Sequence, residues 1–251
     1  MTIETSLVKP LSVDQSNTFD SYTPTELLWF SSPVRYADAW DLQIRLHHER
    51  VMNSRPDTIL ILEHQPVYTV GRRTLVSDWG DDPTATQIDG IEIHHVNRGG
   101  SVTYHGPGQL VVYPILRLTD HVRGIRAYVE QLEEAVIQCL AHNGIVGHRK
   151  AKTPGVWVTA PREAKIASIG IRVDRGVTMH GAALNVDMDL LPFRRITPCG
   201  LRDCHVTSMT EVVGQPVSLL AVTHSLLDQL KQTLALRWTG TPAPIEFHTV
   251  A

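Results

Sequence analysis

Hydrophobic and polar positions in this chain follow two kinds of pattern, and each predicts a different secondary structure. Short apolar runs bounded by Gly, Pro or charged residues predict buried β-strands. Four such runs lie in the first half of the chain, at residues 27–30, 58–62, 67–70 and 91–96. Three closely spaced runs in the second half predict an antiparallel meander, at residues 155–159, 165–173 and 177–186.

Apolar residues with helical spacing predict three longer helices. These are expected over about 34–53, over 125–142, and after Ser218, which is a good N-cap. On the first helix, the buried face is predicted to consist of Ala37, Trp40, Ile44 and Val51. Strands and helices mix without regular βαβ alternation, so the fold class is α+β, or α/β with a mixed sheet.

The chain of 251 residues is long enough to bury a sizeable core in one domain. Residues 1–25 are polar and aperiodic, which predicts a flexible N-terminal extension. Residues 26–240 are expected to form a single folded domain, and residues 241–251 a C-terminal tail.

Composition excludes several classes of protein. With 42% hydrophobic and 20% charged residues, the chain is globular. A net charge of -3 offers no basic surplus for nucleic acid or an anionic membrane. No apolar run reaches the length of a membrane span, and the first residues lack the pattern of a secretory signal. Three cysteines form no even disulfide set, so a reducing, cytoplasmic location is expected.

The densest group of hydrogen-bonding residues lies at 98–114, which begins RGGSVTYHGPGQ and continues into an apolar strand. Two adjacent glycines allow a backbone to approach a ligand closely. Arg98 can hold an anionic group, and Tyr104 and His105 can donate or accept hydrogen bonds. An ordinary hairpin turn would not need so many polar side chains. The run therefore predicts a ligand-lining loop that leads into a core strand.

Cys199 follows a proline and precedes a glycine on an irregular segment, an arrangement that suits an exposed nucleophile. The alternative is a small buried hydrophobe, which is the expectation for Cys139 on its apolar helix face. A zinc site made of Cys199, Cys204 and His205 would lack the second close pair of ligands that such sites usually show.

Two further segments carry polar residues among small or apolar ones. Lys165 begins an apolar strand, where its charge would favour the thiolate of a neighbouring cysteine; the alternative is a solvated lysine at a strand end. His180 begins HGAALN, whose small residues would let an extended ligand lie close, unless His180 is a satisfied core histidine. Four other histidines are expected to be solvated: His47, His48, His94 and His95.

Four motifs occur in order along the chain. They are RGGxxTYHGPGQLVxYPI at 98–115, KIASIGIRV at 165–173, HGxALN at 180–185 and PCG at 198–200. A further segment, LEHQPVYTVGRR, occupies 62–73. Their order and spacing strongly resemble the lipoate-biosynthesis octanoyltransferases, the octanoyl-[acyl-carrier-protein]:protein N-octanoyltransferases, over roughly residues 27–215.

The resemblance implies the catalytic fold of biotin and lipoate protein ligases: a single α+β domain with a mixed, mostly antiparallel central sheet flanked by helices around an acyl tunnel. Cys199 matches the family's acyl-thioester nucleophile, and Lys165 matches its partner lysine. The implied substrate-binding residues are Arg98, Gly99, Gly100, Ser101, Val102, Thr103, Tyr104, His105, Ser168, Ile169, Gly170, His180, Gly181 and Ala182.

The resemblance also implies a reaction and its partners. Octanoyl would pass from octanoyl-acyl carrier protein to Cys199, and then to a lysine of an apo lipoyl domain. The acceptors would be E2 subunits of 2-oxoacid dehydrogenases and the glycine cleavage H protein. No ATP, metal or other cofactor is expected, and the protein is expected to be a monomer.

Two other functions remain open at this point. An ATP-dependent lipoate- or biotin-protein ligase would use the glycine-rich loop as a phosphate cradle, but would not need the PCG cysteine. A non-catalytic module that binds an acyl chain or a lipoyl domain would need neither Cys199 nor Lys165.

Overall fold

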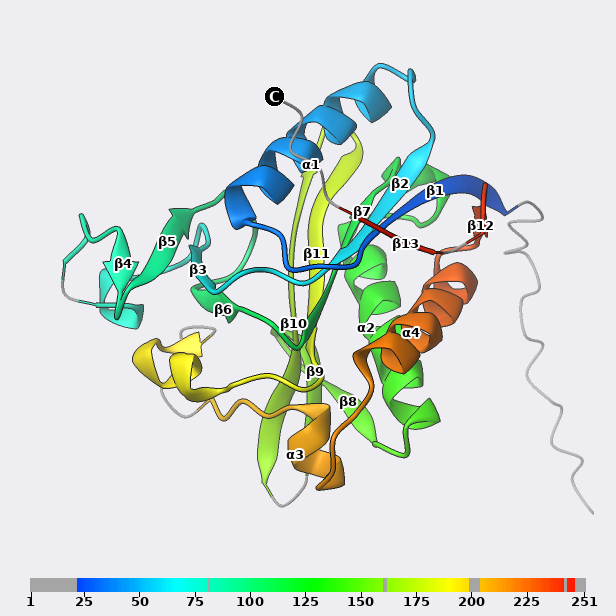
Figure 1. The fold of residues 1–251 in the computed structure, drawn as a ribbon. Coiled ribbons are helices and arrows are strands. Elements are labelled where there is room, and N and C mark those ends of the chain that lie inside the picture. Colours follow the sequence, from blue (N-terminus) through cyan, green and yellow to red (C-terminus); the bar gives the residue numbers. More distant parts are fainter. Residues whose placement is uncertain (1–21, 81, 160–161, 199–203, 242, 247–251) are drawn as a thin grey trace, which may run out of the picture.

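The computed structural model describes residues 22–80, 82–159, 162–198, 204–241 and 243–246. Within these ranges nine strands form one large sheet (Figure 1). They are β1 (Thr23–Phe30), β2 (Asp57–Leu62), β7 (Gln109–Ile115), β8 (Gly147–Lys150), β9 (Thr153–Thr159), β10 (Glu163–Asp174), β11 (Val177–Asn185), β12 (Leu236–Trp238) and β13 (Pro244–Ile245). The order is β12-β1-β2-β7-β11-β10-β9-β8, with β13 paired to β1.

The pairings confirm the expected mixed, mostly antiparallel sheet. Strand β1 is parallel to β2, β12 and β13. Every neighbouring pair from β2 to β8 along the sheet is antiparallel. The predicted meander corresponds to β9, β10 and β11, which follow one another through short turns.

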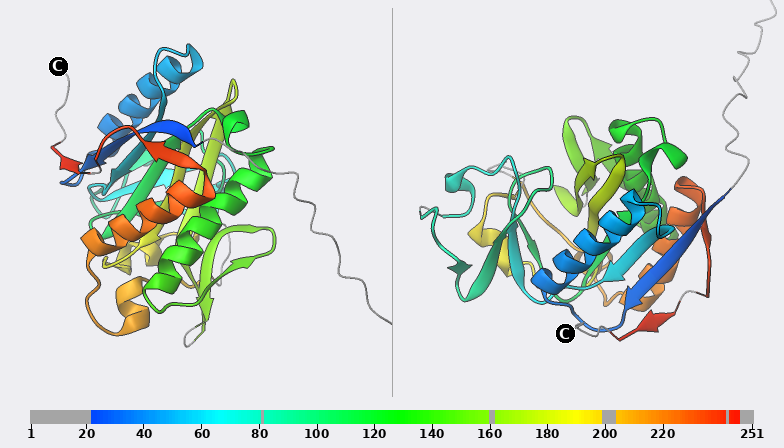
Figure 2. Two further views of the ribbon diagram at one scale, coloured as in Figure 1. Left: turned by 90° about the vertical axis from the view of Figure 1, so that its right-hand side faces the viewer. Right: turned by 90° about the horizontal axis from the view of Figure 1, so that it is seen from above.

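Helices cover both faces of this sheet (Figures 1 and 2). Helix α1 (Tyr36–Val51) packs on one face, and α2 (Ile125–His142) lies beside α4 (Leu219–Thr233) on the other. The side chains of the interior strand β2 alternate between two hydrophobic cores. Ile59 and Ile61 face α2 and α4, whereas Leu60 and Leu62 face α1. This sheet is therefore buried on both faces, as the continuous apolar runs predict.

A second, smaller sheet lies to one side of the large one (Figure 1). Its strands, in the order β4-β5-β3-β6, are β3 (Val67–Val70), β4 (Gln87–Ile88), β5 (Ile91–His95) and β6 (Thr103–His105). Tyr68, Trp79 and Phe193 belong to its own hydrophobic core. The chain passes from β6 directly into β7 of the large sheet, so the glycine-rich motif crosses between the two sheets.

Short helical segments complete the connections. The 3-10 helices are η1 (Val76–Asp78), η2 (Leu118–Asp120) and η3 (Leu191–Arg195), and helix α3 covers Met209–Val213. In the described part of the chain, no helix combines the length and the apolar character needed to cross a membrane.

The predicted buried face of the first helix is correct only in part. Val51 is half-buried against the core, whereas the buried apolar residues of this helix include Ala39, Leu42 and Leu46. Ile44 is 47% exposed, whereas the buried positions of α1 include Gln43, His47 and Arg50. His47, expected to be solvated, is buried, and its Nε2 lies 3.1 Å from the carbonyl of Asp174. These polar side chains have specific partners on the sheet, which apolar spacing alone does not reveal.

Both ends of the predicted domain also differ in detail. Strand β1 begins at Thr23, inside the predicted extension, because β12 pairs with it from Thr23 onward and β2 from Thr25 onward. Strand β13 lies inside the predicted tail and pairs with Trp29 and Phe30. Strand β8, an edge strand of sequence GHRK, has no apolar run and was not predicted.

Candidate active site

A cavity of about 340 Å³ is lined by residues from both sheets. Its volume lies in the range typical of small-molecule sites. All predicted substrate-binding residues except Gly99 and Tyr104 line it, and so does Lys165. Those twelve residues are Arg98, Gly100, Ser101, Val102, Thr103, His105, Ser168, Ile169, Gly170, His180, Gly181 and Ala182. Three segments that are distant in sequence therefore meet around one space, while the role of each residue in binding substrate stays a prediction.

Gly99 and Tyr104 have other surroundings. The Gly99 amide donates to the carbonyl of Ile171 at 2.9 Å, which ties the glycine-rich loop to β10. The Tyr104 ring packs against Tyr68 and Phe193, with ring centres 5.4 and 5.6 Å away. These two residues shape the loop from behind the cavity wall.

Lys165 lies at a β-bulge near the start of β10. Lys165 pairs with Trp157 and Ala167 pairs with Val156, so Ile166 is the extra residue on this strand. Bulges re-aim side chains and are common beside active sites. The lysine is only 4% exposed. Its Nζ donates to the carbonyl of Pro154 at 2.9 Å and lies 5.6 Å from the centre of the Trp157 ring. This is a buried, partnered ammonium rather than a solvated lysine at a strand end.

Gly155 provides the space that the Lys165 side chain occupies. A Cβ atom at Gly155 would lie 2.5 Å from Cε of Lys165 and 2.5 Å from the carbonyl oxygen of Ala167. The Gly155 φ angle is +125°, a region that residues with side chains rarely adopt. Its amide donates to the Glu133 carboxylate of α2 at 2.9 Å. The backbone around the lysine is thus held by a helix on the far side of the sheet.

Arg98 holds the glycine-rich loop in shape. Its NH1 group donates to the carbonyls of Gly99 and Ser101 at 3.0 and 2.8 Å. Its NH2 and Nε groups donate to the carbonyl and hydroxyl of Thr69 on β3, at 2.7 to 3.3 Å. These bonds match all five donors of a guanidinium group. Arg98 therefore joins the loop to the small sheet, and the prediction that it also holds an anionic group remains untested.

Aromatic and histidine rings form an uncharged part of the cavity wall. Burial lowers the pKa of His180, a lining residue, to about 3. Burial also lowers the pKa of His64 to about 4; this residue does not line the cavity, but its ring centre lies 5.5 Å from that of His105. Burial also holds the pKa of His105 well below its ordinary value and raises the pKa of the Tyr113 hydroxyl well above 10. The Tyr36 ring stacks on His105, with 6.2 Å between ring centres. These rings are neutral at neutral pH, so this part of the wall suits an alkyl chain.

Known proteins share this architecture and much of this sequence. The family model for the lipoyl protein ligase A/B catalytic domain matches residues 35–231. The octanoyltransferase of Thermobifida fusca is 44% identical over 238 residues, which are 89% of this chain and 97% of that protein. The octanoyltransferase of Leifsonia xyli is 48% identical over 191 residues, 74% of this chain and 81% of that protein.

This chain belongs to the octanoyltransferase family. As a member, it is an acyltransferase of protein lipoylation, which excludes a purely non-catalytic binding module. The fold is also that of a bipartite lipoate protein ligase from Thermoplasma acidophilum, which was studied with its E2 lipoyl domain. That structure superimposes with a TM-score of 0.63 at 16% identity, covering 91% of this chain and 88% of the ligase. The expected relationship to the ligase fold is confirmed.

Cys199, the proposed nucleophile of this octanoyltransferase, lies outside the described residues. The described residues on either side of it are attached to the cavity wall. The Thr197 amide donates to the carbonyl of Asp78, a cavity-lining residue, at 2.5 Å. On the other side, the carbonyl of His205 accepts from the Lys165 amide at 2.7 Å. Cys139, by contrast, is a fully buried residue of the hydrophobic core, as its position on α2 predicts.

Several other residues that line the cavity were not predicted. They are Tyr36, Arg73, Leu75, Asp78, Tyr113, Lys152, Thr153, Pro154 and Ala183. The sequence KTPG at 152–155 offers one signal, a cation followed by a Pro-Gly pair, which lies within the first residues of β9. Tyr36 could not be found from pattern, because it begins a helix whose buried face was misassigned.

Proposed function

We propose that this octanoyltransferase takes the octanoyl group from octanoyl-acyl carrier protein onto Cys199 and then passes it to a specific lysine of a lipoyl domain. The proposal is carried by the buried Lys165 ammonium in the wall of a cavity built from the three predicted substrate-binding segments. It is supported by the attachment of Thr197 and His205, on either side of Cys199, to that wall and to Lys165.

In the first half of the reaction, the Cys199 thiolate attacks the thioester carbonyl of the donor. The ammonium of Lys165 favours the thiolate over the thiol. The bond between the carbonyl carbon and the donor sulfur breaks, and the departing thiolate takes a proton from Lys165. The products are an octanoyl-Cys199 thioester, a free carrier thiol and a neutral Lys165.

In the second half, the neutral amine of the acceptor lysine attacks the octanoyl-Cys199 thioester. Lys165 accepts the proton that the attacking nitrogen loses, and the Cys199 thiolate departs. The amide product is formed, and the thiolate–ammonium pair returns to its starting state. One thioester is exchanged for another before an amide forms, so the proposed cycle needs no ATP and no metal.

The acyl chain is proposed to lie against the uncharged rings of the cavity wall, including Tyr36, His105, Tyr113 and His180. A wall without charge avoids the cost of removing an ionised group from water next to an apolar chain. The rings also exclude water from the reactive carbonyl. Water would otherwise hydrolyse the thioester.

Acceptors are proposed to be lipoyl domains of 2-oxoacid dehydrogenase E2 subunits and the glycine cleavage H protein. The fold shared with the Thermoplasma ligase, whose partner is an E2 lipoyl domain, supports the first of these. A monomeric, cytoplasmic enzyme is part of the same proposal.

The test combines purified protein, octanoyl-acyl carrier protein and an apo lipoyl domain, with and without ATP. Transfer is expected without ATP, and mass spectrometry should find an octanoyl adduct on the enzyme. Cys199→Ala should abolish the adduct, and either Cys199→Ala or Lys165→Met should lower the rate by at least about 10³-fold.

Two results would contradict the proposal. An octanoyl adduct that persists on Cys199→Ala would place the intermediate on another residue. A requirement for ATP would instead indicate the chemistry of an acyl-adenylate ligase.

A further inference from the structure

A row of buried polar side chains runs from the glycine-rich loop to the strand that carries Lys165. His105 Nδ1 lies 2.7 Å from Gln109 Oε1, and Gln109 Nε2 donates to Asn185 Oδ1 at 2.9 Å. Asn185 Nδ2 donates in turn to the carbonyl of Thr207 at 2.9 Å. All four residues are at most 7% exposed. A buried polar group needs a partner, so each member of the row depends on the next.

The bonds fix the direction in which every proton points. Gln109 uses Nε2 as a donor to both the Tyr104 carbonyl and Asn185, so its Oε1 must accept from His105. His105 therefore carries its proton on Nδ1, and its Nε2 accepts from the Thr69 hydroxyl at 3.3 Å. Burial holds the pKa of His105 well below its ordinary value, which agrees with one neutral tautomer. The row has a single consistent arrangement.

Thr207 completes the link to Lys165. The Thr207 amide donates to the carbonyl of Lys165 at 3.0 Å, and the Lys165 amide donates to the carbonyl of His205 at 2.7 Å. Strand β11 does not provide these bonds, because its pairing with β10 stops at Ala167. Where β11 ends, the segment 205–207 continues the pairing with β10, as a parallel bridge between Lys165 and Val206.

Asn185 and Gln109 lie at this junction. They face each other as a cross-strand pair, Asn185 as the last residue of β11 and Gln109 as the first of β7. The bulge at Ile166 weakens the hold of β9 on this part of β10. The backbone amide and carbonyl of Lys165 therefore take their hydrogen-bond partners from segment 205–207. Asn185, at the end of β11, holds that segment through the bond from its side chain to the Thr207 carbonyl.

We propose that Gln109 and Asn185 are positioning residues that set the place of Lys165 in the cavity wall. Neither touches the reacting atoms; they act through Thr207 on the backbone of the lysine. This inference rests on the proposed role of Lys165 as the proton carrier for the thiol.

The test compares Asn185→Leu, which removes both bonds, with Asn185→Asp, which keeps an acceptor for Gln109 but cannot donate to Thr207. Both are expected to lower kcat about 10²-fold, the effect of a misplacement near 1 Å. KM should stay within about twofold, because Lys165 is proposed to act in proton transfer and neither Asn185 nor Thr207 lines the cavity. In a Cys204→Ser background, the pH profile of Cys199 alkylation by iodoacetamide should move toward that of Lys165→Met.

Thr178→Val is the matched control. Thr178 lies on the same strand, is fully buried, and donates to the carbonyl of Pro114 at 2.6 Å, but it does not line the cavity. This variant should lose comparable thermal stability and keep the kcat and alkylation profile of the native protein.

Native kcat and a native alkylation profile in a folded Asn185→Leu or Asn185→Asp protein would overturn the inference. An equal displacement of the profile in Thr178→Val would also overturn it, since general loosening would then explain the effect. If Lys165→Met itself leaves turnover and alkylation unchanged, the proposed function fails rather than this inference.

Discussion

At the scale of single residues, Gly155 shows how closely the site is built around Lys165. The glycine has a φ angle of +125°, and its Cα faces Cε of the lysine with no space for a methyl group. Gly155→Ala must therefore move the lysine, the backbone of β10, or both. We expect a destabilisation of about 1–3 kcal/mol from the backbone alone, together with a loss of turnover larger than the loss of folded protein.

Gly176 supplies the control for that substitution. It has a φ angle of +77°, and no atom lies within 4 Å of the position its Cβ would take. Gly176→Ala should cost about 1–2 kcal/mol from backbone conformation and leave kcat unchanged. Chemical denaturation and steady-state rates of both variants make the comparison. Equal kcat values for the two variants would show that Gly155 is not needed to place Lys165.

Most of the residues that line the cavity could be predicted from the sequence. Glycine-rich and small-residue segments beside apolar strands mark places where a ligand approaches a rigid core, and these segments do meet around one cavity. The five bonds of Arg98 could not be foreseen, because their acceptors belong to β3 and to backbone carbonyls. Sequence gives the type of a side chain, whereas its partners depend on the tertiary fold.

At the scale of elements, helix α1 illustrates where pattern reasoning fails. Its inner face carries Gln43, whose Oε1 accepts from the backbone amide of His180 at 2.9 Å. His180 has a φ angle of +58° in the middle of β11, so its amide turns from the sheet toward the helix. The spacing of apolar residues cannot predict a polar contact of this kind. The predicted helix exists, and its inner face combines the apolar residues Ala39, Leu42 and Leu46 with polar residues that have partners on the sheet.

This contact gives a prediction for the packing of α1. Gln43→Leu keeps the size of the side chain but leaves the buried His180 amide without an acceptor, which should cost about 1–3 kcal/mol. Ile44→Ala, at a position that is 47% exposed, should change the free energy of unfolding by no more than about 0.5 kcal/mol. Urea denaturation of the two variants measures both values. If Ile44→Ala lowered the free energy of unfolding more than Gln43→Leu does, Ile44 would belong to the buried face of α1, as its apolar spacing predicts.

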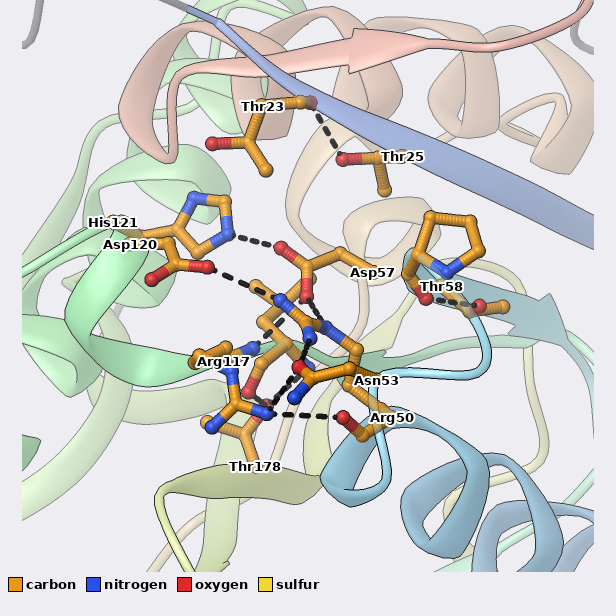
Figure 3. A network of polar contacts seen from close by, with 12 residues as sticks. Thr23, Thr25, Arg50, Asn53, Asp57, Thr58, Arg117, Asp120, His121 and Thr178 are labelled. Atoms are coloured by element: carbon orange, nitrogen blue, oxygen red, sulfur yellow. Dashed lines mark hydrogen bonds and ion pairs between the residues drawn. The ribbon is translucent and has the colours of Figure 1, made fainter.

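At the scale of the whole molecule, one buried charge joins elements from both faces of the sheet. Figure 3 shows the carboxylate of Asp57, at the start of β2, between the side chains of His121 and Arg50. The distances are 2.6 Å to His121 Nε2 and 2.5 Å to Arg50 Nε. The other nitrogen of His121 lies 2.7 Å from the carbonyl of Leu234, just beyond α4. Through its two ring nitrogens, His121 thus joins the carboxylate at the start of β2 to the backbone at the end of α4.

The network therefore connects the end of α1, the start of β2, the η2 turn and the end of α4, which are widely separated in sequence. No pattern in the sequence marks this network, since an isolated Asp or Arg is ordinarily a surface residue. The side chains of Asp57 and His121 are fully buried. Removing one partner of such a group leaves the others charged and uncompensated, so its loss should affect the stability of the whole domain.

Asp57→Asn should lower the free energy of unfolding at pH 7 by about 3–5 kcal/mol. Burial raises the pKa of Asp57, but hydrogen bonds from His121, Arg50 and the Arg117 amide outweigh burial and hold the pKa below its ordinary value. The unfolded chain, with a pKa near 3.9 for this group, then takes up the proton first as the pH falls. The stabilisation from Asp57 is therefore present at neutral pH and is lost below about pH 4.

Melting temperatures between pH 7 and pH 3 should fall more steeply for the native protein than for Asp57→Asn. Glu130→Gln, which removes an exposed ion pair on α2, should keep the native pH dependence, with a change within about 1 kcal/mol. Parallel melting curves for the native and Asp57→Asn proteins over this range would mean that the buried carboxylate does not govern the acid stability of the fold.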